Sequence, residues 1–360
     1  MIDQPQEFDF MCSHNRWFRR TSVLAGLAAS CVIAPVSAQS FDITMPTTAD
    51  RWMYPFNATP GYRPAGSTFG YTPFPDETSF DNRDGQVIVA FDTSEIVPTG
   101  QGPESYDVST LTFEITLAGN ASGPIDLTVD DWRTYLPEEA KDALPDEDPG
   151  RPIELFAAGF RNGYDRLNWA EGDSFSDTDL FGQNTRNVFS AEITPDGSLR
   201  DASSNFTQDF TANPLAVGFF PGYEAGETPV EGEVATFELD TSDPLVRGWL
   251  GESFDEGRLV FAVTSLIGAS QGDATLTQFY LRENPLVEVG VRESSVISFT
   301  VDIIDVCEVL EDLNGDCIVD GADLGIFLSL WNTADESADY NDDGIVNGGD
   351  LGRLLAAFGL

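Results

Sequence analysis

The sequence predicts a mainly β fold, an antiparallel β-sandwich of jelly-roll type, followed by a small C-terminal helical module. About ten short segments between residues 86 and 303 indicate the sandwich, because apolar and polar residues alternate in them with period two. The long helical patterns that separate the strands of α/β proteins are missing from this region. The module is indicated by apolar residues at helical spacing in 321–331 and 348–359.

Gly, Pro, Asn and Asp separate the predicted strands, as is typical of turns. The stretch before them, 39–82, is rich in aromatic residues, Pro and Gly and shows little periodicity, so no strand is predicted there. One helix is expected at 243–254, because Asp243-Pro244 is a typical helix start. Residues 282–285 are expected to end a strand and form a turn. The predicted strands are 86–94, 109–119, 125–132, 153–160, 187–194, 215–220, 234–241, 258–266, 275–283 and 296–303.

The first 38 residues have the features of a secretory signal peptide. Arginines precede an uncharged stretch at 21–38, which ends in the small residues Val36-Ser37-Ala38, a pattern that signal peptidase cuts. A membrane anchor is the competing interpretation, and Pro35 and the modest hydrophobicity of the stretch disfavour it. Arg19-Arg20 leaves the general and the twin-arginine export routes open.

Three domains follow from these patterns, a signal peptide at 1–38, a β-sandwich at 39–305 and a C-terminal module at 306–360. We expect the mature protein to be secreted, either extracellular or at the cell surface. No other segment is apolar enough to span a bilayer, so no membrane span is expected once the signal peptide is cleaved.

The chain is strongly acidic, with 61 Asp and Glu against 18 Lys and Arg and a formal net charge of −43. This charge excludes nucleic acid and anionic membrane surfaces as partners, because both require basic residues. It favours solubility and the binding of cations. The one histidine, His14, lies in the predicted signal peptide, so the mature chain has neither a histidine-based nucleophile system nor an imidazole metal site.

Two acidic loops carry the most specific signal in the sequence. They align without gaps at an interval of 27 residues (339 − 312), and each runs into a predicted helix through Asp-Leu-Gly. Their oxygen-bearing residues have the spacing of an EF-hand loop, whose positions 1, 3, 5, 7, 9 and 12 surround one Ca²⁺. We also expect Val319 and Val346, next to position 7, to pair the two loops. The sequence therefore predicts two Ca²⁺ ions, one held by Asp312, Asn314, Asp316, Ile318, Asp320 and Asp323, and one by Asp339, Asn341, Asp343, Ile345, Asn347 and Asp350.

This pair of loops resembles a type I dockerin, in which two calcium loop–helix repeats close a chain. The resemblance covers 311–360 and implies that Asp is normal at loop position 12, as Asp323 and Asp350 are. It also implies a cohesin-like partner that recruits secreted polysaccharide-degrading enzymes. The alternative role is a calcium-stabilised cap, or a module that attaches the chain to a cell-surface component. At loop positions 10 and 11, where such dockerins carry a hydroxyl pair, this chain has Gly321-Ala322 and Gly348-Gly349.

A pair of cysteines, Cys307 and Cys317, remains after removal of the signal peptide. Cys317 occupies position 6 of the first loop, where a left-handed turn normally requires glycine, and its strain should cost about 1 kcal/mol. In an oxidising compartment, a lone pair this close predicts a disulfide. Closing so short a loop contributes about 2.5–3 kcal/mol, which exceeds that strain. Two free thiols are the alternative.

The large domain resembles, at 51–57, 80–94 and 279–286, uncharacterised secreted bacterial β-sandwich domains found upstream of such modules. Some relatives of this type are carbohydrate-binding modules. An aromatic cluster near its N-terminus suits stacking on sugar rings, and the alternative is that these rings pack the edge of the sandwich. The cluster contains Trp52, Tyr54, Phe56, Tyr62, Phe69, Tyr71 and Phe74.

Three functions are open for this domain. It is a non-catalytic module that binds polysaccharide, a structural component of a surface or matrix, or a glycoside hydrolase that uses a carboxylate pair. The non-catalytic interpretations, linked to extracellular polysaccharide breakdown, rank above the hydrolase, because the spacing of the acidic residues singles out no pair. The carboxylates considered for hydrolysis are Asp130, Asp131, Glu154, Asp165, Glu171 and Asp173.

Overall fold

The computed structural model describes residues 39–70, 80–268, 276–304, 310–314 and 319–359. The fold is mainly β with antiparallel sheets, as the sequence predicts. All the described strands lie within 39–303, and two helices follow within 321–356.

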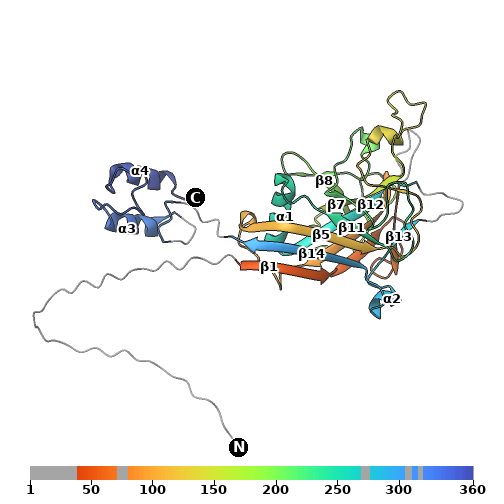
Figure 1. The fold of residues 1–360 in the computed structure, drawn as a ribbon, viewed down its shortest axis with the longest axis horizontal. Coiled ribbons are helices and arrows are strands. Elements are labelled where there is room, and N and C mark those ends of the chain that lie inside the picture. The colour runs from red at the N-terminus through yellow and green to blue at the C-terminus, as the bar shows by residue number, and fades with distance from the viewer. Residues whose placement is uncertain (1–38, 71–79, 269–275, 305–309, 315–318, 360) are drawn as a thin grey trace, which may run out of the picture. The chain divides into compact units, whose positions relative to one another are not determined.

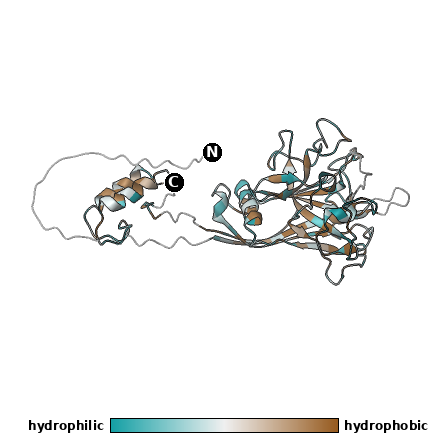
Figure 2. Ribbon diagram, turned by 90° about the horizontal axis from the view of Figure 1, so that it is seen from above, coloured by the Kyte–Doolittle hydropathy of each residue, from teal (hydrophilic) through white to brown (hydrophobic). Residues whose placement is uncertain are grey.

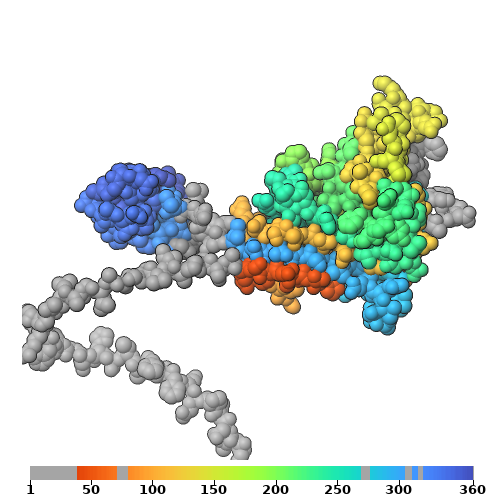
Figure 3. All heavy atoms as spheres, viewed as in Figure 1, coloured from red at the N-terminus to blue at the C-terminus, as the bar shows by residue number. Residues whose placement is uncertain are grey.

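The smaller sheet has four strands in the order β1-β14-β5-β11, and each neighbouring pair is antiparallel. Figure 1 and Figure 3 show β1, β14 and β5 side by side along one face of the β domain. A register shift at Thr300/Val301 interrupts the pairing of β14 with β5. The strands are β1 (Gln39–Pro46), β5 (Tyr106–Thr116), β11 (Val234–Glu238) and β14 (Ser295–Ile303).

The larger sheet has ten strands, and its main path runs β13-β3-β4-β12-β7-β8-β9. Strand β2 pairs with β4, and the two-residue strands β6 and β10 pair with β7, β6 in parallel. The strands are β2 (Ala49–Met53), β3 (Ala65–Gly70), β4 (Arg83–Asp92), β6 (Ile125–Asp126), β7 (Arg151–Phe160), β8 (Val188–Ile193), β9 (Leu199–Asp201), β10 (Ala216–Val217), β12 (Arg258–Ser265) and β13 (Thr277–Tyr280).

Strand β4 buries side chains on both faces of the larger sheet. Val87, Val89 and Phe91 join the main core, which also contains residues of β5, β11 and β14 from the smaller sheet. Ile88 and Ala90 enter a second core on the opposite face. The two sheets thus share one core, and the larger sheet is covered again on its other side. This explains why β4, β7 and β12 are nearly continuous apolar runs.

Helix α1 (Pro244–Glu256) confirms the predicted helix. Asp243 caps it by accepting a hydrogen bond from the N–H of Leu245, and Gly257, at φ +81°, ends it. Trp249, Leu250 and Phe254 bury its apolar face in the main core. The expected turn lies at 282–283, after the end of β13, and helix α2 (Pro285–Glu288), capped by Asn284, follows it. The 3₁₀-helices η1 (Pro103–Ser105), η2 (Trp132–Tyr135) and η3 (Phe206–Gln208) complete the domain.

The prediction of little regular structure at 39–82 is wrong, because β1, β2 and β3 lie there. β2 carries buried charged residues, Asp50 and Arg51, which mask its periodicity, and β3 is built from small residues. β9 was not expected either. The strands expected at 125–132 and 215–220 shrink to the two-residue β6 and β10.

The C-terminal region contains helices α3 (Gly321–Ser329) and α4 (Gly348–Ala356), as the helical spacing predicts. Phe327 and Leu354, which occupy equivalent positions in the two repeats, are fully buried in its core with Val319, Tyr340 and Val346. Figure 2 shows hydrophobic stretches in the helical part of this region. Cys307 and Cys317 lie outside the described residues, so their disulfide stays a prediction. Within the described residues, every helix is too short or too polar to span a bilayer.

Candidate functional site

The second acidic loop, at 339–350, is described in full and turns around its first carboxylate. Asp339 at position 1 accepts hydrogen bonds from the N–H groups of Asp343 (3.2 Å) and Gly344 (2.7 Å). Gly344 at position 6 has φ +87°, a conformation that favours glycine. The backbone therefore wraps around the carboxylate of Asp339 before any ion is considered.

The position-12 carboxylate of Asp350 closes this loop. It is fully buried and accepts hydrogen bonds from the N–H groups of Asn341 (3.2 Å) and Asn347 (2.9 Å). Asn347 caps α4 in return by accepting from the N–H of Gly349 at 2.8 Å. One side chain thus links the beginning of the loop, its end and the helix.

The first loop repeats this arrangement where the structure describes it. Asp323 is fully buried and accepts from the N–H groups of Leu313 (2.9 Å), Asn314 (3.1 Å) and Asp320 (2.8 Å). Burial raises the pKa of Asp323, but these backbone donors outweigh it and leave the pKa below its usual value. Asp320 caps α3 as Asn347 caps α4. Asp316 and Ile318 lie outside the described residues.

The two repeats exchange backbone hydrogen bonds. The N–H of Asn332 donates to the carbonyl of Val346, and the N–H of Gly359 donates to the carbonyl of Val319, both at 2.9 Å. The two donor residues are 27 positions apart (359 − 332), and so are the two acceptor residues (346 − 319), which is the interval between the repeats. Val319 and Val346 share one core, as expected of paired loops, but the described backbone bonds of Val346 run to Asn332 and Thr333.

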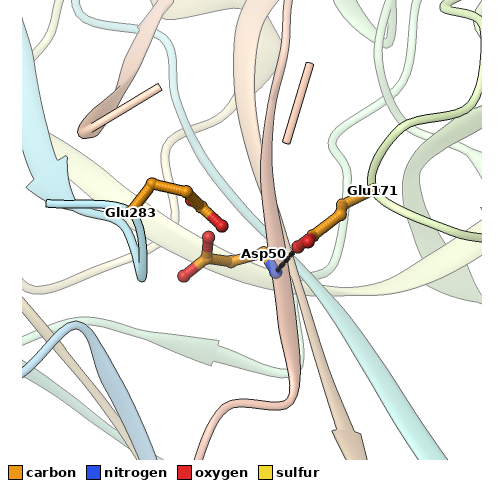
Figure 4. Close-up of side chains that lie close together, drawn as sticks. All are labelled: Asp50, Glu171 and Glu283. Atoms are coloured by element: carbon orange, nitrogen blue, oxygen red, sulfur yellow. Dashed lines mark hydrogen bonds between the residues drawn. The ribbon is translucent and has the colours of Figure 1, made fainter. Parts of the chain in front are cut away.

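The acidic side chains of the second loop are not drawn together. Among the described residues, three carboxylates with oxygens within 4.8 Å of one another occur instead at Asp50–Glu171–Glu283 (Figure 4) and at Asp126–Asp130–Asp148. In the loop, Asp339, Asp343 and Asp350 each accept backbone N–H groups, which spreads their charges. Carboxylates approach closely when a cation, a neighbouring arginine or a shared proton offsets their repulsion.

The group of Asp126, Asp130 and Asp148 is already compensated by neighbouring side chains. Asp130 accepts hydrogen bonds from the Tyr135 hydroxyl (2.6 Å) and from Arg151 (2.7 Å). Arg151 also forms an ion pair with Asp146 at 2.9 Å. This group is therefore a structural network around Arg151.

Two surface cavities enclosed by described residues, of about 440 Å³ beside α2 and about 200 Å³ beside the start of α1, are lined by residues other than the six carboxylates considered for hydrolysis. Each candidate is instead held by its neighbours, Glu154 by Arg83, Asp131 by Arg133, Asp130 by Arg151, and Asp165, Asp173 and Glu171 by backbone N–H groups.

The aromatic residues near the N-terminus form part of one ring network. Trp52 stacks on Tyr54, which contacts Phe56 and Phe69 edge-on. The network continues from Phe56 to Phe80 and Phe181. Its exposed end consists of Phe56 (53% exposed) and Phe181 (46% exposed).

One described aromatic residue of the predicted cluster falls outside this network. Tyr62 is 80% exposed and makes no ring contact within the described part of the chain. Tyr71 and Phe74 lie outside the described residues. The sequence does not predict that Phe181 joins this network. Its surrounding segment is polar, and it lies 125 positions from Phe56 (181 − 56).

Comparison with known proteins gives this chain no family, since no protein-family model and no curated protein matches it. Its function therefore has to be inferred from its own residues and their geometry.

Proposed function

We propose that the protein is a secreted calcium-binding protein whose C-terminal module, 306–360, takes up two Ca²⁺ ions. The observation that carries this proposal is the equivalence of Asp323 and Asp350. Both are fully buried, close an acidic loop and belong to a capping box at the start of a helix. An acidic run that is merely solvated would leave these carboxylates in water.

The chemistry of the loops supports calcium over other metals. Their ligand positions offer carboxylate, amide and backbone carbonyl oxygens, and no nitrogen or sulfur ligand occupies one. Ca²⁺ prefers about six to eight such oxygens in a flexible arrangement. Binding would draw Asp339 and Asp343 together and offset the repulsion between them.

The module is, by this proposal, dockerin-like and attaches the protein to a cohesin-like partner or to a cell-surface component. Support comes from two exposed apolar pairs that the repeat places at equivalent positions. Leu328 and Leu355 are 53% and 52% exposed, and Trp331 and Phe358 are also exposed. Such residues mark interaction surfaces. Loop positions 10 and 11 lack hydroxyl groups, so a partner would contact this apolar surface instead.

The β domain, by the same proposal, is a jelly-roll-like sandwich without catalytic activity that binds polysaccharide. The chain passes repeatedly between the two sheets, which supports the jelly-roll topology. Phe56 and Phe181 offer exposed ring faces for stacking on a sugar. The second candidate, a glycoside hydrolase, needs two carboxylates about 5–10 Å apart in a cleft.

Calcium titration of single-loop variants tests the proposal. Asp339→Ala removes the position-1 ligand of the second loop and should lower the calcium stoichiometry by one ion. Asp342→Asn is the matched control, because Asp342 occupies position 4, is exposed, and has φ +56°, which asparagine tolerates. Equal stoichiometry for the Asp339→Ala variant and the wild type would contradict the assignment.

A further inference from the structure

The cavity of about 440 Å³ beside α2 is built on the outer face of the smaller sheet, the face opposite the main core. Val296 of β14 pairs with Pro46 of β1 and with Glu114 of β5, and all three residues line the cavity. Cross-strand partners share one face of a sheet. This row points outward, because the next residues along two of the strands, Ile115 and Ile297, belong to the main core.

The segment that follows α2 forms another side of the cavity. Val287, Gly290, Arg292 and Glu293 line it, just before β14 begins (Figure 1). Backbone hydrogen bonds hold this segment in a turn, since the N–H groups of residues 291 and 292 both donate to the carbonyl of Leu286, at 2.8 and 3.0 Å. The cavity is therefore formed in the free chain, as is usual for a ligand site.

Three charged side chains converge on the cavity without pairing with one another. Glu114 is half-buried, and Arg292 and Glu293 are exposed. Within the part of the chain that the structure describes, none of the three takes part in an ion pair or a side-chain hydrogen bond. Their donors and acceptors therefore remain available to water or to a polar ligand.

The outer face of the sheet next to the cavity carries hydroxyl groups in register. Thr44 lines the cavity and pairs with Ser298, which pairs in turn with Thr112. The hydroxyl oxygens of Thr44 and Ser298 are 2.8 Å apart. Thr300 and Thr110 form the next row. A hydroxyl group both donates and accepts hydrogen bonds, so this face suits a ligand that is itself rich in hydroxyls.

We propose that the cavity binds sugar residues of an uncharged polysaccharide. Its volume lies in the range of small-ligand sites, about 300–1,000 Å³. Val287 and Val296 offer an apolar surface to the C–H groups of a sugar ring. Arg292 donates hydrogen bonds to the sugar hydroxyls, and Glu114 and Glu293 accept hydrogen bonds from them. An acidic sugar would meet two carboxylates and a single arginine, so an uncharged sugar fits the cavity better.

This inference rests on the proposed polysaccharide binding for the class of its ligand, and it adds a second site to the β domain. The described residues that line the cavity include no member of the ring network around Phe56 and Phe181. The two sites therefore recognise sugars differently. The rings stack on a sugar face, whereas the cavity binds sugar hydroxyls.

The test is isothermal titration of the full mature chain with cellobiose, xylobiose and di-N-acetylchitobiose, which are uncharged disaccharides. The wild type should bind at least one of them. Glu114→Gln and Arg292→Gln each remove a charged hydrogen-bonding group and should lower the affinity about tenfold or more. Glu238→Gln is the matched control, because Glu238 pairs with Thr112 on the same outer face and lies outside the cavity. Circular dichroism checks that the variants fold.

Phe181→Ala separates this site from the ring network. It should weaken retention on insoluble polysaccharide and leave the affinity for the disaccharide unchanged. Retention of the wild type on polysaccharide without any disaccharide binding would overturn this site and leave the proposed function in place. Unchanged affinity in both Glu114→Gln and Arg292→Gln would overturn it as well. Tighter binding of digalacturonate than of the uncharged disaccharides would contradict the class of ligand. A wild type that binds neither disaccharide nor polysaccharide would overturn both sites.

Discussion

The backbone N–H of Gly359 donates to the carbonyl of Val319 at 2.9 Å, which joins the end of the second repeat to the first acidic loop. The bond from Asn332 to Val346 joins the end of the first repeat to the second loop in the same way. Each loop is therefore supported by the segment that follows the helix of the other repeat. The two repeats should consequently gain and lose order together.

The shared core of the two repeats predicts a common response to substitution. Phe327→Ala and Leu354→Ala each remove a fully buried side chain and should cost about 2–5 kcal/mol. Hydrogen exchange should then increase in both loops, whichever repeat carries the change. Leu328→Ala and Leu355→Ala are the controls, because these side chains are about half exposed and should cost under about 0.5 kcal/mol. Faster exchange in the substituted repeat alone would contradict the coupling.

A buried ion pair supports the larger sheet. Arg83 donates two hydrogen bonds of 2.8 Å to the carboxylate of Glu154, and both side chains are at most 3% exposed. Glu154→Gln should destabilise the β domain by about 3–5 kcal/mol, because it leaves the charge of Arg83 buried without its partner. Urea unfolding measures this loss. Glu238→Gln is the control, because Glu238 is the exposed last residue of β11. A loss no larger than that of the control would show that the pair is dispensable.

Asp84 should make stability depend on pH. Burial raises the pKa of Asp84 from 3.8 to about 7. The charge of Arg186 lowers this pKa, and the charge of Asp81 raises it. The folded state therefore holds this proton more tightly than the unfolded state, and the contribution of Asp84 to stability falls as the pH rises from about 4 to 7.

In the Asp84→Asn variant this dependence should disappear. Relative to the wild type, the variant should gain on the order of 1 kcal/mol of stability for each pH unit between 5 and 7. Urea unfolding at pH 5, 6, 7 and 8 measures the difference. Parallel stability profiles for the two proteins would exclude a raised pKa at Asp84.

The exposed end of the ring network is the surface on which the proposed binding of polysaccharide depends. Phe181→Ala should weaken retention on a bound insoluble polysaccharide about fivefold, the equivalent of about 1 kcal/mol of ring contact. Tyr62→Ala is the control, because Tyr62 is exposed but outside the network. A pull-down over cellulose, xylan and chitin measures retention. Failure of the wild type to bind any of a broad set of glycans would remove the carbohydrate-binding interpretation.

Strong alternation made much of the β domain predictable from the sequence. β5 and β14 follow from apolar residues that repeat with period two, and β4, β7 and β12 from runs rich in Val, Ile and Phe. β2 was missed because tertiary contacts, and not local pattern, bury its charged residues. Arg51, for example, is buried against the backbone of Asp173 from a distant loop.

The candidate sites also differ in how far the sequence alone reveals them. The two acidic loops are local, so the spacing of the proposed calcium ligands is visible within twelve residues. The cavity beside α2 is assembled from segments 70 and 178 residues apart (114 − 44 and 292 − 114), and no spacing rule reveals it. Glu114 lies in a predicted strand, but only the fold supplies its neighbours in the cavity.

The central claim, that the C-terminal loops bind two Ca²⁺ ions, is tested most directly by calcium stoichiometry in two matched chains. Isothermal titration should compare the full mature protein with its Asp312→Ala/Asp339→Ala variant, both stripped with EDTA beforehand. The account predicts that the variant binds two fewer ions per chain than the wild type. Equal stoichiometry in the two proteins would contradict it.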